Sequence, residues 1–172
     1  MRKKRWRALL AGLLLLFAFA VAGCGGGPKA DVPIFIMFPE NVAFMDKSEE
    51  LQASLQQKLG ERPTVSVYIS PIFNMEKLIV ELAAGDNGVF ILPKKQFDLF
   101  LQEGGFVSLD DVMNKDDFPE GVFNGQLYGV PVHDAKWLKE AGYRGGEMIA
   151  FIPARAKKQE EAKQVIKAIA EK

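Results

Sequence analysis

The sequence predicts an α/β fold built on a mostly parallel sheet. Two observations carry this prediction. Short, continuous apolar runs recur along the chain, and between them lie longer stretches in which apolar residues return every three or four positions. Continuous apolar runs are typical of strands buried on both faces, and the longer period is typical of amphipathic helices. Their regular alternation predicts strands joined by right-handed helical crossovers within one sheet.

The first half of the chain supplies three pairs of a strand and a helix. The strands are expected where β-branched and aromatic residues gather, at residues 32–38, 64–70 and 89–92. The helices are expected from apolar residues at helical spacing, each followed by glycine, at residues 46–59, 75–84 and 96–103.

The second half is less regular but adds two strands. The Asn124-Gly125 pair is a turn signal and introduces a strand over residues 126–132. Asp134 is expected to cap a short helix over residues 135–141. A further strand and a final amphipathic helix are expected at residues 148–152 and 157–171, which brings the predicted sheet to five strands.

The amino terminus has the order of a secretory signal: basic residues, an apolar stretch of about 15 residues, then small residues before Cys24. The run Val21-Ala22-Gly23-Cys24 resembles the lipobox of bacterial lipoproteins. This resemblance implies that residues 1–23 are a cleaved signal peptide and that Cys24 is acylated and anchored in a membrane. The alternative is an uncleaved membrane anchor with a free thiol. Residues 24–31 are then a glycine-rich tether, and residues 32–172 form one domain.

Removal of residues 1–23 leaves 17 basic and 22 acidic residues, a net charge of −5. An acidic domain without a Lys/Arg-rich patch argues against nucleic acid as a partner. No cysteine remains for a disulfide, so the domain depends on its apolar core.

Four stretches resemble the extracellular solute-binding proteins of bacterial ABC importers, in particular the sugar-type receptors. They occur in the order of that family and comprise Glu81-Leu82-Ala83-Ala84-Gly85-Asp86 with the strand after it, Gly105-Phe106-Val107-Ser108-Leu109-Asp110-Asp111, Gln126-Leu127-Tyr128-Gly129-Val130-Pro131, and residues 146–153 with the following helix. The resemblance implies a lobe of about five strands, one antiparallel to the rest, with helices on both faces.

The chain departs from this family in length. Its members fold as two lobes with the ligand between them, whereas only about 15 residues here separate the strand ending at Val132 from the one starting near Met148. These are too few for a second lobe of domain size. The sequence therefore predicts a truncated, one-lobed relative, in which the short segment closes over the gap.

Candidate ligand-binding residues follow the strands, because ligands of open α/β sheets bind beyond the carboxyl ends of the strands. Aromatic rings with amide, hydroxyl and carboxylate neighbours suit a sugar-like solute. The alternative is that the aromatic residues belong to the core. The candidates are Phe38, Glu40, Asn41, Ser70, Phe73, Asn74 and Tyr128.

Catalysis is not expected, because the chain has no Gly-x-Ser-x-Gly elbow, no phosphate-binding loop and no histidine pair. No cofactor or metal is expected either. His133 stands alone, and the spacing of Asp110-Asp111 and Asp116-Asp117 differs from that of an EF-hand loop. Lys94 and Lys95 open a predicted helix, with Asp98 expected to pair with one of them.

Two functions remain open at this point. The resemblance implies a membrane lipoprotein, facing the extracytoplasmic side, that binds a small solute and serves an ABC permease. The alternative is an interaction lipoprotein that uses the lobe as a scaffold for another envelope protein. Exposed apolar side chains at Trp137, Leu138 and Tyr143 would favour the protein partner, and their burial would remove that support.

Overall fold

The computed structural model describes residues 29–40 and 47–171. The predicted signal peptide and Cys24 lie outside this part of the chain, and so does Asn41. Among the described residues, no helix is long and apolar enough to cross a bilayer.

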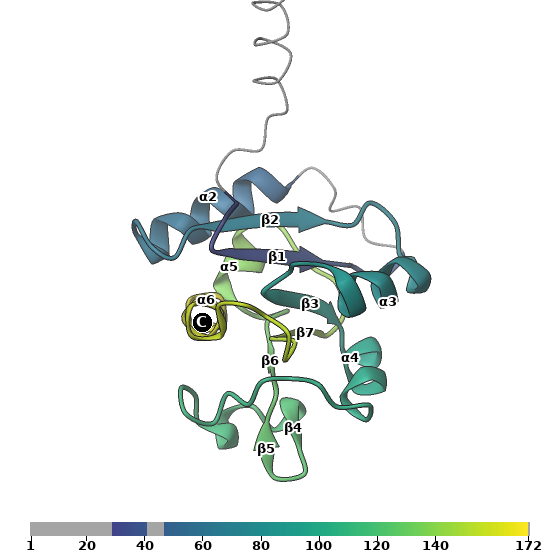
Figure 1. Ribbon diagram of the computed structural model, residues 1–172. Coiled ribbons are helices and arrows are strands. Elements are labelled where there is room, and N and C mark those ends of the chain that lie inside the picture. Colours follow the sequence, from purple (N-terminus) through teal and green to yellow (C-terminus); the bar gives the residue numbers. More distant parts are fainter. Residues whose placement is uncertain (1–28, 41–46, 172) are drawn as a thin grey trace, which may run out of the picture.

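A five-stranded sheet forms the centre of the domain (Figure 1). Its order is β2-β1-β3-β7-β6, with β7 antiparallel to both of its neighbours and the other four strands pointing the same way. The α/β class and the mostly parallel five-stranded sheet are therefore confirmed. The strands are β1 (Val32–Ile36), β2 (Val65–Ile69), β3 (Val89–Pro93), β6 (Gly129–Pro131) and β7 (Met148–Phe151).

Helices cover both faces of the sheet and define two apolar cores. Leu51, Trp137 and Val165 represent the helices of the first core, which are α2 (Ser48–Leu59), α5 (Lys136–Glu140) and α6 (Gln159–Ala170). Leu78 and Phe97 represent those of the second core, which are α3 (Met75–Ala84) and α4 (Lys94–Leu101). Since strand side chains alternate between faces, β1 sends Ile34 and Ile36 to the first core and Phe35 to the second.

The predicted strand over residues 126–132 is wrong as a single element. The chain forms β4 (Val122–Phe123) and β5 (Gln126–Leu127), a small hairpin around Asn124-Gly125, before β6 joins the main sheet. The division falls at Tyr128, whose N–H donates to the carbonyl of Gly121 at 2.9 Å. Gly121 belongs to the second of two short 3₁₀ turns, η2 (Lys115–Asp117) and η3 (Pro119–Gly121).

The expected cap of the short helix is also wrong. The N-cap of α5 is Ala135, with no side-chain hydrogen bond, and Asp134 instead pairs with Lys139 at 2.8 Å. In contrast, the expected pairing at the start of α4 is confirmed, because Lys94 and Asp98 lie 2.6 Å apart.

The edge strand β2 is covered by two glutamines of α2. Gln52 Oε1 accepts from the N–H of Val67 at 3.1 Å, and Gln56 Oε1 accepts from the N–H of Val65 at 2.9 Å. Unpaired backbone groups on an edge strand are a template for unwanted strand pairing. The two glutamines are one turn apart on α2 and occupy these donors.

Candidate functional site

The carboxyl ends of β1 and β2 lie side by side, as the candidate site requires. The N–H of Ser70 donates to the carbonyl of Ile36 at 2.8 Å, and the N–H of Met37 donates to that of Ile91 at 3.1 Å. The segments that follow the first three strands therefore begin at one edge of the sheet. Phe38 and Glu40 follow β1, and Ser70, Phe73 and Asn74 follow β2.

The polar groups after β2 are used within the fold. The Ser70 side chain is buried, and its hydroxyl donates to the carbonyl of Ile72 at 2.9 Å. Asn74 is the N-cap of α3, where its Oδ1 accepts from the N–H of Lys77 at 2.8 Å. An N-cap side chain satisfies a backbone donor that the helix leaves free. Both side chains thus shape the turn from β2 into α3.

The two phenylalanines of the candidate set lie in different cores. Phe38 is only 6% exposed and packs in the first core, whereas Phe73 is partly buried against the second. Glu40 is exposed at the same edge of the sheet. The candidates after β1 and β2 therefore share an edge but do not form one aromatic platform.

Phe38 is covered by the segment between β6 and β7. Its ring stacks on that of Tyr143, with centroids 5.1 Å apart. The Tyr143 hydroxyl donates to the carbonyl of Gly146 at 2.9 Å, and burial raises the pKa of Tyr143 to about 12. The sequence predicts that the Phe38 ring stacks on a sugar, but in the structure the Tyr143 ring covers it.

Tyr128 lies at the other end of the sheet. It precedes β6, and the register places Gly129 opposite Phe151, which is itself opposite Phe90 near the start of β3. Its hydroxyl donates to Gln126 Oε1 at 2.6 Å. The structure does not bring Tyr128 together with the other candidates, because it precedes β6 near the amino-terminal end of β3, whereas they follow the carboxyl ends of β1 and β2.

The segment between β6 and β7 is part of the core. Trp137, Leu138 and Tyr143 are all buried, and the Trp137 Nε1 donates to the carbonyl of Leu51 in α2 at 3.0 Å. An indole buried with its N–H satisfied is typical of a structural residue. This burial removes the support that exposed apolar side chains here would have given to a protein partner.

Three of the titratable residues singled out from the sequence, Asp110, Asp111 and His133, contact other groups of the fold. Asp111 accepts from the buried Lys163 at 2.6 Å, and this hydrogen bond lowers the pKa of Asp111. Asp110 accepts from the N–H of Leu127 at 3.2 Å. His133 Nε2 lies 3.4 Å from Asp134 Oδ2, while its Nδ1 is buried without a hydrogen bond. Over residues 29–40 and 47–171, no three His, Cys, Asp or Glu side chains gather as a metal site.

A cavity of about 330 Å³ lies where sequence reasoning placed no site. Its walls combine aromatic and aliphatic side chains with one acid and one base, and are formed by Leu82, Phe100, Glu103, Gly104, Gly105, Phe106, Pro153, Ala154 and Arg155. The Arg155 guanidinium donates to the carbonyls of Glu81 and Leu82 in the last turn of α3. The Phe106 ring packs on that of Phe151, with centroids 4.5 Å apart.

The only sequence signal for this cavity is the Gly104-Gly105 pair, which was interpreted as a helix stop. Both glycines have positive φ, 78° and 85°, so the chain turns sharply after α4 and leaves a hollow beside it. The opposite wall comes from the segment after β7, through a bridge between Phe106 and Pro153. Neither feature indicates a cavity before the two segments are known to be adjacent.

Comparison with known proteins identifies one curated relative. The chain is 31% identical over 133 residues to the putative lipoprotein YteS of Bacillus subtilis (strain 168), and the match covers 71% of this chain and 78% of the relative. The chain belongs to the family of YteS. The match covers similar shares of the two proteins, so this chain and YteS have similar lengths. No family model matches the sequence.

Solved structures with a similar arrangement are solute-binding proteins. They include an extracellular solute-binding protein family 1 from Alicyclobacillus acidocaldarius (20% identical, TM-score 0.45, covering 61% of this chain and 29% of that one). A second is the ABC substrate-binding protein Lmo0181 from Listeria monocytogenes in complex with cycloalternan (18% identical, TM-score 0.43, covering 59% and 28%). The chain spans less than a third of the length of either.

Proposed function

We propose that this protein is a lipid-anchored, extracytoplasmic binding lobe that binds a small, sugar-like solute without catalysis. The observation that carries the proposal is the sheet itself. Its five strands, with β7 alone antiparallel and helices on both faces, have the arrangement that the resemblance to solute-binding proteins implies for one lobe. Membership of a family that includes a putative lipoprotein supports the anchor.

The anchor is tested at Cys24, the only cysteine in the chain. With Cys24→Ala, we expect the protein to leave the detergent phase in a detergent partition assay, while the parent protein stays in it. Mass spectrometry of the amino-terminal peptide should detect acylation that begins at Cys24. An unmodified cysteine in a chain that keeps residues 1–23 would refute the anchor.

Two places are candidates for the solute. At the carboxyl edge, Glu40 and Phe73 are accessible, but the stacked Phe38 and Tyr143 rings fill the space between β1 and the segment after β6. The cavity beside Phe100 and Arg155 needs no rearrangement. Its volume is at the lower end of ligand sites, which span roughly 300 to 1,000 Å³. We therefore assign the solute to the cavity, with its apolar face against Phe100 and its hydroxyls near Glu103 and Arg155.

A thermal-shift screen against mono- and oligosaccharides, polyols and amino acids tests this assignment. A solute at 100 times its dissociation constant adds about 2.7 kcal/mol to the free energy of unfolding. We expect Phe100→Ala to abolish the shift and Phe73→Ala to preserve it, since both rings are partly buried in the same core but only Phe100 lines the cavity. The reverse result would return the solute to the carboxyl edge.

One observation supports the alternative function, in which the domain is a scaffold for another envelope protein. Large apolar side chains are exposed along β2, the following loop and α3, namely Tyr68, Ile72, Ile79 and Val80. Exposed apolar side chains mark interaction surfaces when they form a continuous patch. If no solute shifts the melting temperature, a photo-crosslinker at Val80 should capture a permease or a two-lobed receptor, and one at Leu99 of α4 serves as the exposed apolar control.

A further inference from the structure

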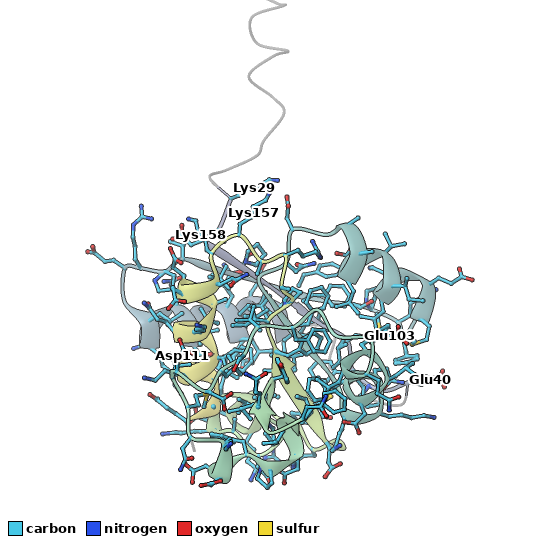
Figure 2. All side chains as sticks on the ribbon, turned by 60° about the horizontal axis from the view of Figure 1, so that its bottom comes forward. Lys29, Glu40, Glu103, Asp111, Lys157 and Lys158 are labelled. Atoms are coloured by element: carbon cyan, nitrogen blue, oxygen red, sulfur yellow. The ribbon has the colours of Figure 1, made fainter. Side chains whose placement is uncertain are left out.

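Basic side chains from three distant parts of the sequence gather where the described chain begins. Lys29 and Lys157 bind opposite oxygens of Asp86, at 3.2 and 2.8 Å. Beside them, Arg62 lies 3.3 Å from Asp31, which also binds Lys158. Figure 2 shows Lys29, Lys157 and Lys158 together at the end of the domain where the described chain begins. We call these six residues the tether-exit cluster.

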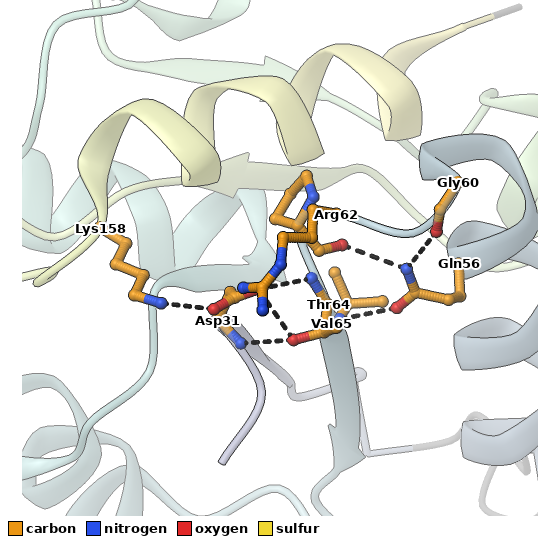
Figure 3. Close-up of polar contacts among 8 residues, drawn as sticks. Asp31, Gln56, Gly60, Arg62, Thr64, Val65 and Lys158 are labelled. Carbon is orange, nitrogen blue, oxygen red and sulfur yellow. Dashed lines mark hydrogen bonds and ion pairs between the residues drawn. The ribbon is translucent and has the colours of Figure 1, made fainter. Parts of the chain in front are cut away.

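Three cations of the cluster are more exposed than either of its acids, of which Asp86 is 50% exposed. The side chains of Lys29, Arg62 and Lys157 are 86%, 80% and 78% exposed, and that of Lys158 is 46% exposed. Asp31 is only 10% exposed, because it also accepts from the N–H and the hydroxyl of Thr64 at 2.9 and 3.0 Å (Figure 3). A partner approaching this end of the domain therefore meets ammonium and guanidinium groups first.

The charge of the cluster opposes that of the rest of the protein. Four cations and two carboxylates give the cluster a net charge of +2, whereas the chain after residue 23 carries −5. The remaining residues of that chain thus carry −7. An anionic surface attracts this end of the domain and repels the remainder.

The length of the tether brings the cluster to the membrane. Four residues lie between Cys24 and Lys29, and the five steps from one to the other span at most about 17 Å. We propose that the tether-exit cluster is a docking surface for anionic lipid headgroups, which orients the domain with the amino ends of β1 and β2 toward the bilayer. This inference rests on the lipid anchor of the proposed function.

The electrostatics of a bilayer give the expected size of the effect. A basic residue close to an anionic leaflet shifts a binding or orientation equilibrium by about fivefold. The attraction acts over about 10 Å at 0.1 M salt, which is less than the reach of the tether, so it selects one orientation of an already anchored domain. The carboxyl edge of the sheet then faces away from the membrane.

The test uses the full acylated protein in vesicles that contain a nitroxide-labelled headgroup lipid. A fluorophore is placed at Glu61→Cys, next to Arg62, or at Glu140→Cys, at the end of α5. Both positions are exposed acids, so the two labelled proteins have the same charge. Vesicles of phosphatidylcholine alone are compared with vesicles that also contain phosphatidylglycerol.

In the anionic vesicles, we expect the label at position 61 to be quenched several-fold more than the label at position 140, and this preference should disappear in high salt. Lys29→Glu with Lys157→Glu should abolish the preference. Lys95→Glu with Lys167→Glu makes the same change in net charge at exposed lysines outside the cluster and should preserve it.

Three outcomes separate the possibilities. Equal quenching at the two positions, or a preference that does not depend on anionic lipid and salt, would overturn the docking surface and leave the anchor intact. Failure of the protein to float with phosphatidylcholine vesicles in high salt would overturn the anchor, and with it this inference. A loss of preference in the Lys95 and Lys167 variant would show a general charge effect and would also refute the assigned surface.

Discussion

Phe38 illustrates how one residue changes its role between sequence and structure. As an aromatic residue just after a strand, it fits a ligand platform, but its ring is buried against Tyr143. Replacing a buried phenylalanine with alanine typically costs about 3 to 5 kcal/mol. We expect Phe38→Ala to lower the free energy of unfolding by this amount in urea titrations.

The control for this prediction is Phe73→Ala, which removes a partly buried ring of the same size. Its cost should be clearly smaller than that of Phe38→Ala. If instead Phe38→Ala left stability unchanged and weakened a solute-induced shift, the ring would be a ligand platform after all.

Asp31 makes the stability of the domain depend on pH. The hydrogen bond from Lys158 and those from Thr64 hold the pKa of this carboxyl well below its ordinary value. A pKa that is lower in the folded state stabilises the fold above the unfolded pKa, and this contribution is lost as the pH falls toward the folded pKa. The free energy of unfolding should therefore fall as the pH is lowered below about 4.

Urea titrations of Asp31→Asn at several acidic pH values check this prediction. The variant should be less stable than the parent protein at neutral pH, and the difference should shrink as the pH falls. A difference that stays constant with pH would show that the carboxylate charge at position 31 does not matter.

Contacts between residues close together in the sequence were predictable, and contacts between residues far apart in the sequence were not. Lys94 pairs with Asp98 one helical turn away, so that pairing was predictable from spacing alone. The partner of Phe38 lies about a hundred positions further along the chain, and nothing local indicates it. Asp31 was assigned to the tether for the same reason, because Thr64 and Lys158 reach it only once the sheet is assembled.

At the scale of elements, the boundary between α2 and β2 makes a specific prediction. Gln52 Oε1 occupies the N–H of Val67 on the open edge of β2. In Gln52→Ala this donor loses its partner, and we expect its amide hydrogen to exchange faster. Gln52→Glu retains a side-chain oxygen at the same position and should keep the protection.

Amide hydrogen exchange at Val67 and Val65 provides the measurement. Val65 is an internal reference, since its N–H is held by Gln56 in both variants. Equal exchange at Val67 in the alanine and glutamate variants would show that the glutamine does not protect the edge.

Elements with a strong local period were predictable, and those defined by close packing were not. The helix at residues 75–84 has the predicted bounds, and β3 differs from the prediction by one residue. The predicted strand at residues 126–132 failed because an apolar run gives no sign of where a backbone approaches another. A Cβ atom at Gly121 would lie 1.7 Å from the carbonyl oxygen of Gly129, so the turn before β4 can approach the start of β6 only with a glycine at position 121.

At the scale of the whole molecule, the cavity and the tether-exit cluster were beyond the reach of the sequence. Each joins segments that are far apart in the chain, such as Gly104-Gly105 with Arg155, or Lys29 with Lys157. The mostly parallel five-stranded sheet was within reach, because its strands are local apolar runs that alternate with stretches of helical period.

The position of β7 predicts how the domain tolerates truncation. This strand pairs with β3 on one side and β6 on the other, so it joins the two parts of the sheet. A chain that ends at Gly146 should lack a cooperative unfolding transition in circular dichroism, since it loses this strand and the buried Phe151. A chain that ends at Ala170 should keep the transition. A cooperative transition in the shorter chain would show that the parallel strands are stable alone.

The late position of β7 has a consequence for biosynthesis. The strand that joins β3 to β6 comes from residues 148–151, although these two neighbours are complete at residues 93 and 131. Until these four residues have been synthesised, β3 and β6 have no strand between them, so we expect the sheet to stay open during synthesis. The order of the strands thus places closure of the sheet after the synthesis of residue 151.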